Sequence, residues 1–160
     1  MVGARSAMLV AASGLRGEAA ILGPGRCRLR MIQHMHGLHL TADLHGCDAT
    51  RPAMTEPAAL RELCVAAVRR SGLTPVSELF HRFAPAPGGT GPAGITGVVL
   101  LAESHLAIHT WPEQQAVTLD VYVCNYSADN RAKAQALLAA LQAAFAPQQA
   151  QVQALERGVL

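Results

Sequence analysis

Four strand-like segments follow one another in the middle of this chain without a helical stretch between them, and this order restricts the fold most. They are 74–83, 95–102, 105–110 and 117–124. The last of them places valine or leucine at every second position, which is the period of a strand with two different faces. Strands joined by such short connections pair antiparallel, so the pattern favours an antiparallel sheet over an alternation of strands and helices.

Two segments have helical periodicity instead. Residues 57–70 carry an apolar stripe at helical spacing, made of Leu60, Leu63, Ala67 and Val68. Residues 129–145 are rich in alanine and leucine. With a first strand at 35–43 and a final edge strand at 150–155, the order becomes β-α-β-β-β-β-α-β. This order predicts an α+β two-layer sandwich, in which the helices cover one face of an antiparallel sheet.

The length and composition fit one hydrophobic core. The chain has 160 residues, of which 51% are hydrophobic and 15% charged, and a chain of this length can bury most of its apolar surface in a single domain. Residues 1–33 are rich in glycine, alanine and arginine without a sustained period, so we expect a poorly ordered extension there. The domain itself is expected to span residues 34–160.

Charge and cysteine usage argue against several classes of protein. The net charge is +2 and aromatic residues make up 4% of the chain, so neither a basic nucleic-acid footprint nor a base-stacking surface is indicated. No apolar segment approaches the length of a membrane span. The four cysteines form no CxxC pair, so we expect no zinc site and no dense disulfide framework. A reducing cytoplasm is the simplest setting for such a chain.

A turn with reactive side chains follows the most apolar strand. Glu103, Ser104, His105, His109 and Glu113 lie within eleven positions. Functional side chains are common on the loops that follow rigid elements, and a hydroxyl at a strand end suits a nucleophile. The same residues also fit an exposed polar turn of a β-hairpin, and from the spacing alone both interpretations are open.

Cys124 and a group of histidines each allow two interpretations. Cys124 ends a strand on its polar face, where a thiol could act as an acid, but it could equally be packed beneath the following helix. Four histidines precede Cys47, but on a strand His34 and His36 face away from His39 and do not converge as they stand. We therefore expect no metal site.

With these residues assembled, the chain resembles the bacterial S-adenosylmethionine decarboxylase proenzyme family, a pyruvoyl-dependent enzyme class. The resemblance covers residues 37–125 and rests on four segments, which read GLHLTADLHGCD from Gly37, FHRF from Phe80, GITGVVLLAESHLAIHTWPE from Gly94 and LDVYVC from Leu119. The combination of Glu-Ser-His with His-Thr-Trp-Pro-Glu at this spacing is highly specific, and it outweighs the plainer interpretations above.

The resemblance implies that the chain cleaves itself between Glu103 and Ser104. Ser104 would attack the carbonyl of Glu103, and elimination with hydrolysis would then convert residue 104 into a pyruvoyl group, a covalent cofactor. The β chain would be 1–103 and the α chain 104–160. In turnover the pyruvoyl carbonyl would form a Schiff base with the substrate amine and accept the electrons freed as carbon dioxide leaves.

The resemblance also assigns roles to five side chains. His109 matches the family residue that removes the α-proton during elimination, and Thr96 aligns with a family serine that assists the tetrahedral intermediate. Cys124 matches the cysteine that reprotonates the α-carbon after decarboxylation. Glu113 matches the acid that holds the ribose hydroxyls, and Phe83 matches an aromatic residue that stacks on adenine.

Two departures from the family concern the substrate. The loop 84–94 is longer than in short bacterial members, and Thr96 replaces a serine. The leading hypothesis is decarboxylation of S-adenosylmethionine, which supplies aminopropyl groups for spermidine. The alternatives are a pyruvoyl-dependent decarboxylase of ornithine or arginine and a non-catalytic binding protein; Glu113 and Phe83 favour the adenosyl substrate. The family further implies a homodimer of αβ units with the site near the subunit boundary.

Overall fold

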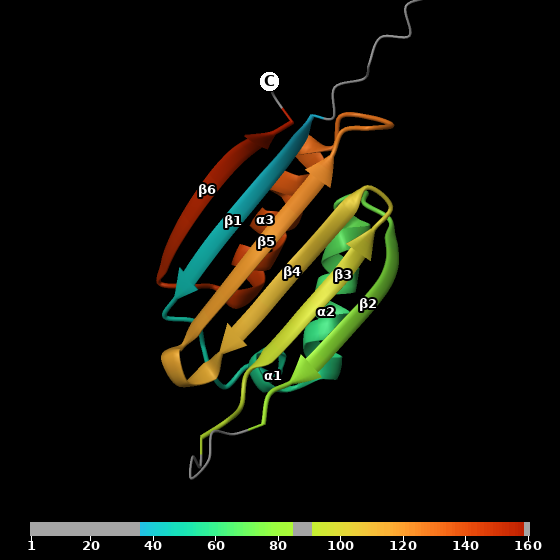
Figure 1. Cartoon of the computed structure of the whole chain (residues 1–160). Helices are drawn as coiled ribbons and strands as arrows, with labels where there is room; N and C mark the ends of the chain where they lie inside the picture. The colour runs from blue at the N-terminus through green and yellow to red at the C-terminus, as the bar shows by residue number, and fades with distance from the viewer. Residues whose placement is uncertain (1–35, 85–90, 159–160) are drawn as a thin grey trace, which may run out of the picture. The chain divides into compact units, whose positions relative to one another are not determined.

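The computed structural model describes residues 36–84 and 91–158, and within them the chain forms a six-stranded antiparallel sheet with its helices on one side (Figure 1). The strands are β1 Gly37–His45, β2 Pro75–Arg82, β3 Ile95–Leu101, β4 Ser104–Trp111, β5 Ala116–Cys124 and β6 Gln149–Arg157. The helices are α1 Pro52–Thr55, α2 Pro57–Arg70 and α3 Arg131–Phe145, with a short 3-10 turn at Pro112–Gln114. This architecture is the α+β two-layer sandwich that the sequence predicts. The extension expected at residues 1–33 lies outside the described residues.

The predicted elements are present, with small differences at their ends. Helix α2 has the bounds expected from its apolar stripe. Helix α3 begins at Arg131 rather than at residue 129, because the Asp129 carboxylate accepts a hydrogen bond from the Arg131 amide at 3.0 Å and closes a turn just before the helix. The sequence does not predict α1 or the 3-10 turn. Both begin with proline and are too short to show helical periodicity.

The strand order in the sheet is β2-β3-β4-β5-β1-β6. The four central segments of the sequence follow one another as neighbours, since consecutive strands without a helix between them turn back beside one another. Strand β1 departs from this rule, because it lies between β5 and β6 and pairs with both of them (Figure 1). Its first residue, Gly37, is thereby placed opposite Cys124 on one side and Arg157 on the other.

The hydrophobic core lies between the sheet and the two long helices. Helix α3 packs on β1 and β5, and α2 packs on β2 and β3. The largest fully buried side chains come from both layers and include Phe145, Leu137, Leu60, Leu106 and Ile108. Burying each of them stabilises the fold by about 1.5–3 kcal/mol. The sandwich is thus held together by contacts between segments that are distant in the sequence.

The second face of the sheet is not covered by a helix in the part of the chain that the structure describes (Figure 1). We call it the open face. Several of its side chains are apolar and exposed, including Leu79 at 69% and Leu100 at 47%. Its central polar contact joins His39 Nε2 and Asp120 Oδ1 at 3.2 Å. The open face is formed by His39, Thr41, Leu79, His81, Thr96, Val98, Leu100, His105, Ala107, His109, Trp111, Thr118, Asp120, Tyr122 and Cys124.

Candidate functional site

One end of the sheet brings Ser104 and Cys124 together. Ser104 is the first residue of β4 and lies opposite Val123, the penultimate residue of β5. The backbone amide of Cys124 donates a hydrogen bond to the carbonyl oxygen of Glu103 at 2.9 Å. The peptide bond between Glu103 and Ser104 is therefore held directly against the strand that carries the Cys124 thiol.

The backbone at Ser104 is unusual for a residue with a side chain. Its φ angle is 139°, in a region that L-amino acids rarely adopt and that costs on the order of 1–3 kcal/mol. Strands β3 and β4 are joined here through Ala102 and Glu103 alone, and the Ala102 amide donates to the Thr74 carbonyl at 3.0 Å. The tight turn is thus held on both sides, and the strained residue is the proposed nucleophile.

The Glu103 side chain is held by the segment that leads into α3. Its carboxylate accepts a hydrogen bond from the Ser127 hydroxyl and another from Asn130 Nδ2 at 2.9 Å. The Ser127 amide makes a longer contact at 3.4 Å. These hydrogen bonds, above all the one from the Ser127 hydroxyl, hold the pKa of Glu103 below its usual range. Glu103 is consequently a negatively charged neighbour of Ser104 at neutral pH.

Cys124 lies where the strand periodicity places it, on the polar face of β5. Its side chain is partly buried and shares the open face with Thr118, Asp120 and Tyr122. The thiol is free rather than part of a disulfide. The alternative interpretation, in which Cys124 is packed beneath the following helix, is wrong, because the helices lie on the other side of the sheet (Figure 1).

The opposite end of the sheet brings Thr96 and His109 together. The two residues are direct partners in the β3–β4 ladder, and both side chains lie half-buried on the open face. His81 of β2 pairs with Thr96 in turn. These three residues, with neighbouring aliphatic side chains, line a cavity of about 170 Å³. A hydroxyl and an imidazole therefore share one concave surface.

Phe83 and Glu113 lie at this same end. Phe83 directly follows β2, its amide donates to the Gly94 carbonyl at 2.9 Å, and its ring is 39% exposed. The Phe83 ring meets the His81 ring edge to face, with centroids 6.1 Å apart. Glu113 is an exposed residue of the 3-10 turn that follows β4. An aromatic ring and a carboxylate thus flank the surface formed by Thr96 and His109.

The sequence-predicted residues therefore form two separate groups within one chain. Ser104 and His109 are on the same strand, five residues apart, which corresponds to a separation of about 16 Å between their backbones. We call the group around Ser104 the serine end and the group around His109 the histidine end. The serine end contains Glu103, Ser104 and Cys124, and the histidine end contains Phe83, Thr96, His109 and Glu113.

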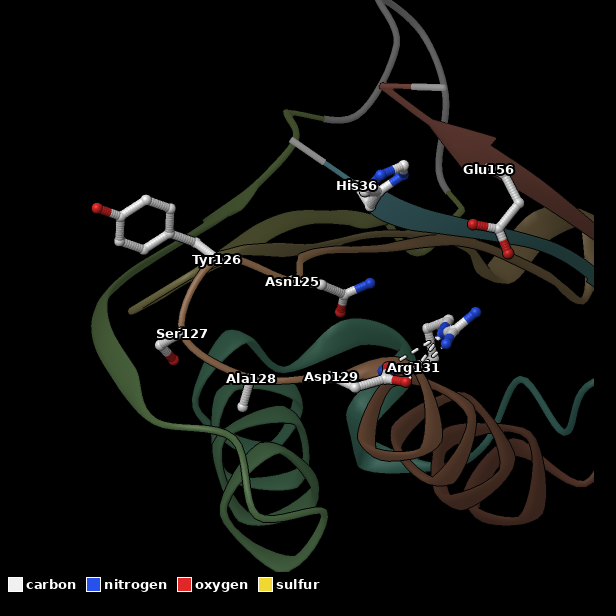
Figure 2. A pocket seen from close by; sticks show the side chains of 8 residues that line it. All are labelled: His36, Asn125, Tyr126, Ser127, Ala128, Asp129, Arg131 and Glu156. Atoms are coloured by element: carbon white, nitrogen blue, oxygen red, sulfur yellow. Dashed lines mark hydrogen bonds and ion pairs between the residues drawn. The ribbon is translucent and has the colours of Figure 1, made fainter. Parts of the chain in front are cut away.

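Sequence reasoning missed Ser127 and Asn130. They fall in the polar stretch before the last helix, which has the composition of an ordinary loop, and no motif marks them. Beside them is a cavity of about 400 Å³ at the start of α3, lined among others by Asn125, Arg131 and Glu156. Figure 2 shows that Arg131 is turned toward Asp129, with which it forms an ion pair at 2.7 Å.

Two further observations concern the described residues as a whole. No group of three histidine, cysteine, aspartate or glutamate side chains that could hold a metal ion occurs in 36–84 and 91–158. In the same stretches, no helix has the length and apolar character needed to cross a membrane. Of the histidines near the start of the domain, His34 lies outside the described residues, and His39 contacts Asp120.

Comparison with known proteins gives a consistent result. A model of the S-adenosylmethionine decarboxylase family matches residues 38–158. The S-adenosylmethionine decarboxylase proenzyme of Aquifex aeolicus is 48% identical over 88 residues, which are 55% of this chain and 58% of that protein. The proenzyme of Persephonella marina is 44% identical over 88 residues, or 55% of this chain and 59% of that one. The aligned part thus spans less than two thirds of the curated relatives.

The structural comparison extends further along the chain than the sequence alignments do. The crystal structure of the adenosylmethionine decarboxylase from Aquifex aeolicus is similar with a TM-score of 0.67 and 37% sequence identity. The match covers 79% of this chain and 93% of that one. It therefore includes the sheet and the helices described above rather than a local motif.

Proposed function

This chain belongs to the S-adenosylmethionine decarboxylase family, and from this premise we propose that it is a self-cleaving, pyruvoyl-dependent decarboxylase of S-adenosylmethionine. The observation that carries the proposal is the Glu103–Ser104 peptide, where a serine with a φ of 139° lies beside Cys124. The names of the curated relatives support this substrate, and no observation favours ornithine or arginine. The product would supply aminopropyl groups for spermidine.

The residues at the serine end suit the formation of a pyruvoyl group. Ser104 Oγ attacks the Glu103 carbonyl carbon, the C–N bond breaks, and an ester with a free amine results. The Cys124 amide already donates to this carbonyl oxygen at 2.9 Å, so it would stabilise the negative charge that the oxygen gains. Removal of the Ser104 α-proton breaks the Cβ–Oγ bond of residue 104 and expels the new C-terminal, main-chain carboxylate of Glu103, and water then releases ammonia from residue 104. Only a residue with a β-heteroatom that can act as a leaving group can follow this route, and Ser104 has one.

In turnover, the pyruvoyl group supplies a carbonyl that takes up the electrons released with carbon dioxide. The Cys124 thiol then returns a proton to the α-carbon of the substrate. Its position supports this role, because Cys124 ends β5 beside residue 104 and its side chain lies on the open face. Cys124, Cys47 and Cys64 form no disulfide with one another in the described residues, and we propose a reducing, cytoplasmic setting for the enzyme because the cysteines are few and widely spaced.

The removal of the Ser104 α-proton requires a base, and the family resemblance assigns this role to His109, which lies at the other end of β4 in the same chain. We assign this role to His109 of a second copy, because His109 of the same chain lies about 16 Å from Ser104 along β4. The open face, with Leu79, Leu100 and Trp111 exposed on it, is the surface through which two copies would pack. A twofold axis would place each serine end against the partner's histidine end and create two equivalent sites.

The histidine end supplies the groups for the adenosyl part of the substrate. Phe83 is exposed enough for its ring to stack on adenine. The exposed Glu113 carboxylate can accept hydrogen bonds from the ribose hydroxyls. Thr96 lies directly beside His109, so its hydroxyl would enter the same site as the imidazole and assist the tetrahedral intermediate at the Glu103 carbonyl. Each complete site would then draw residues from both copies.

Two measurements test this function. Intact-mass analysis of the expressed chain should show a fragment that ends at Glu103 and a fragment that begins with a pyruvoyl group at residue 104, and Ser104→Ala should remain one chain. The cleaved protein should release carbon dioxide from carboxyl-labelled S-adenosylmethionine. An uncut wild-type chain would refute the processing, and release of carbon dioxide only from ornithine or arginine would refute the substrate.

A further inference from the structure

We propose that Asn130 is a positioning residue for self-cleavage and that it acts through the Glu103 carboxylate. This inference rests on the proposed self-cleavage between Glu103 and Ser104. It assigns a role to a polar cluster, made of Ser127, Asn130 and Lys133, that the chemistry described so far does not use.

The Asn130 side chain is buried, at 4% exposure, and its polar atoms have partners. Nδ2 donates to Glu103 Oε2 at 2.9 Å and to the carbonyl oxygen of Cys124 at 3.2 Å, and Oδ1 accepts from Lys133 Nζ at 3.0 Å. Asn130 precedes α3, but its side chain makes no capping hydrogen bond to that helix. Its burial is therefore not explained by helix capping, which is the usual reason for an asparagine at this position.

These contacts connect both acceptor groups of Glu103 to one residue of β5. The Glu103 carbonyl oxygen accepts directly from the Cys124 amide, while the Glu103 carboxylate is joined to the Cys124 carbonyl through Asn130. The connection through Asn130 adds a side-chain restraint on Glu103 to the backbone restraint that the Cys124 amide provides. The carbonyl carbon that Ser104 attacks is thereby held in a single orientation, and small errors in such an orientation slow reactions strongly.

Hydrogen bonds rather than packing hold the Glu103 side chain. A cavity of about 160 Å³ adjoins it, lined by Glu103, Asn130 and Lys133 together with residues of the segment before β2. A side chain that borders open space is not confined by its neighbours, so the carboxylate has room to move once its hydrogen bonds are removed. The Ser127 hydroxyl donates a hydrogen bond to Oε1 of the same carboxylate, so both carboxylate oxygens of Glu103 are hydrogen-bonded.

Two variants separate positioning from general stability. Asn130→Ala removes the side-chain connection between the Glu103 carboxylate and the Cys124 carbonyl, and we expect self-cleavage to slow at least tenfold. Ser127→Ala removes another hydrogen bond to the same carboxylate at an exposed position, where substitutions change stability little. We expect this variant to slow cleavage severalfold with an unchanged melting temperature. Gln135→Ala, on the exposed side of α3, is the matched control and should cleave at the wild-type rate.

Cleavage is followed by gel and intact mass in chains freshly made by cell-free translation, alongside thermal unfolding of each variant carrying Ser104→Ala to prevent cleavage. Wild-type chains that do not cleave would refute the proposed function itself. If the wild type cleaves and Asn130→Ala cleaves at the same rate, only the role of Asn130 is refuted. Slow cleavage in Asn130→Ala with wild-type rates in Ser127→Ala would also refute it, because Asn130 would then not act through Glu103.

Discussion

Co-expression of two inactive variants decides whether each site is built from two copies of the chain. Ser104→Ala destroys the serine end of its own chain, and His109→Ala destroys the histidine end. In a mixed dimer, one site contains both substitutions, while the other site contains the intact Ser104 of one chain and the intact His109 of its partner. Because the two residues lie about 16 Å apart within a chain, we expect this mixture to regain activity.

The size of the recovery follows from the pairing of chains. With equal expression and random pairing, about half of the dimers are mixed, and one of the two sites in each is complete. About one quarter of the wild-type decarboxylase activity should therefore return. In the same sample about half of the His109→Ala chains should be cleaved, while the Ser104→Ala chains stay whole. The α chain formed in the mixture is identified by its mass, because His109→Ala changes the mass of that fragment.

In the matched control, chains with Ser104→Ala are co-expressed with chains that carry Cys124→Ala. Ser104 and Cys124 belong to the same end of the same chain, so no arrangement of a mixed dimer yields a complete site, and this pair should stay inactive. Both mixtures are assayed for carbon dioxide release from labelled S-adenosylmethionine and are compared with each variant alone. If the Ser104→Ala and His109→Ala mixture stays as inactive as its components, the assignment of His109 to the partner is wrong.

Three further predictions follow from single side chains. Cys124→Ala should still cleave but lose about 100-fold or more in turnover, because the thiol that protonates the α-carbon of the substrate is removed. Full turnover in a carbon dioxide assay would refute this role of Cys124. Phe145→Ala should lower the free energy of unfolding by about 3–5 kcal/mol, because Phe145 is fully buried, and urea titration should show a much smaller loss for the exposed Phe83→Ala. Hydrogen bonds from Arg131 lower the pKa of Asp129 from 3.8 to about 2, so this carboxylate stabilises the fold above pH 4 and loses that effect as the pH falls through 2. The free energy of unfolding of Asp129→Asn should therefore approach that of the wild type as the pH falls from 4 to 2. A constant difference across that range would contradict the hydrogen bonds from Arg131 as the cause of the pKa shift.

The secondary structure was predictable because its signals are local. The alternation in 117–124 and the apolar stripe of 57–70 are set by the geometry of strands and helices, and both elements appear as expected. The polar face of β5 likewise follows from its period of two. The short elements α1 and the 3-10 turn were not predictable, since a single turn carries no period.

Residue types and spacing alone left both a functional site and a plain polar turn open at Glu103 and Ser104, and the resemblance of four sequence segments to a known family indicated the proposed chemistry. Only the tertiary structure places β1 between β5 and β6 and buries Asn130 against Glu103. Both features depend on contacts between segments that are distant in the sequence, and a local pattern of residues does not predict such contacts.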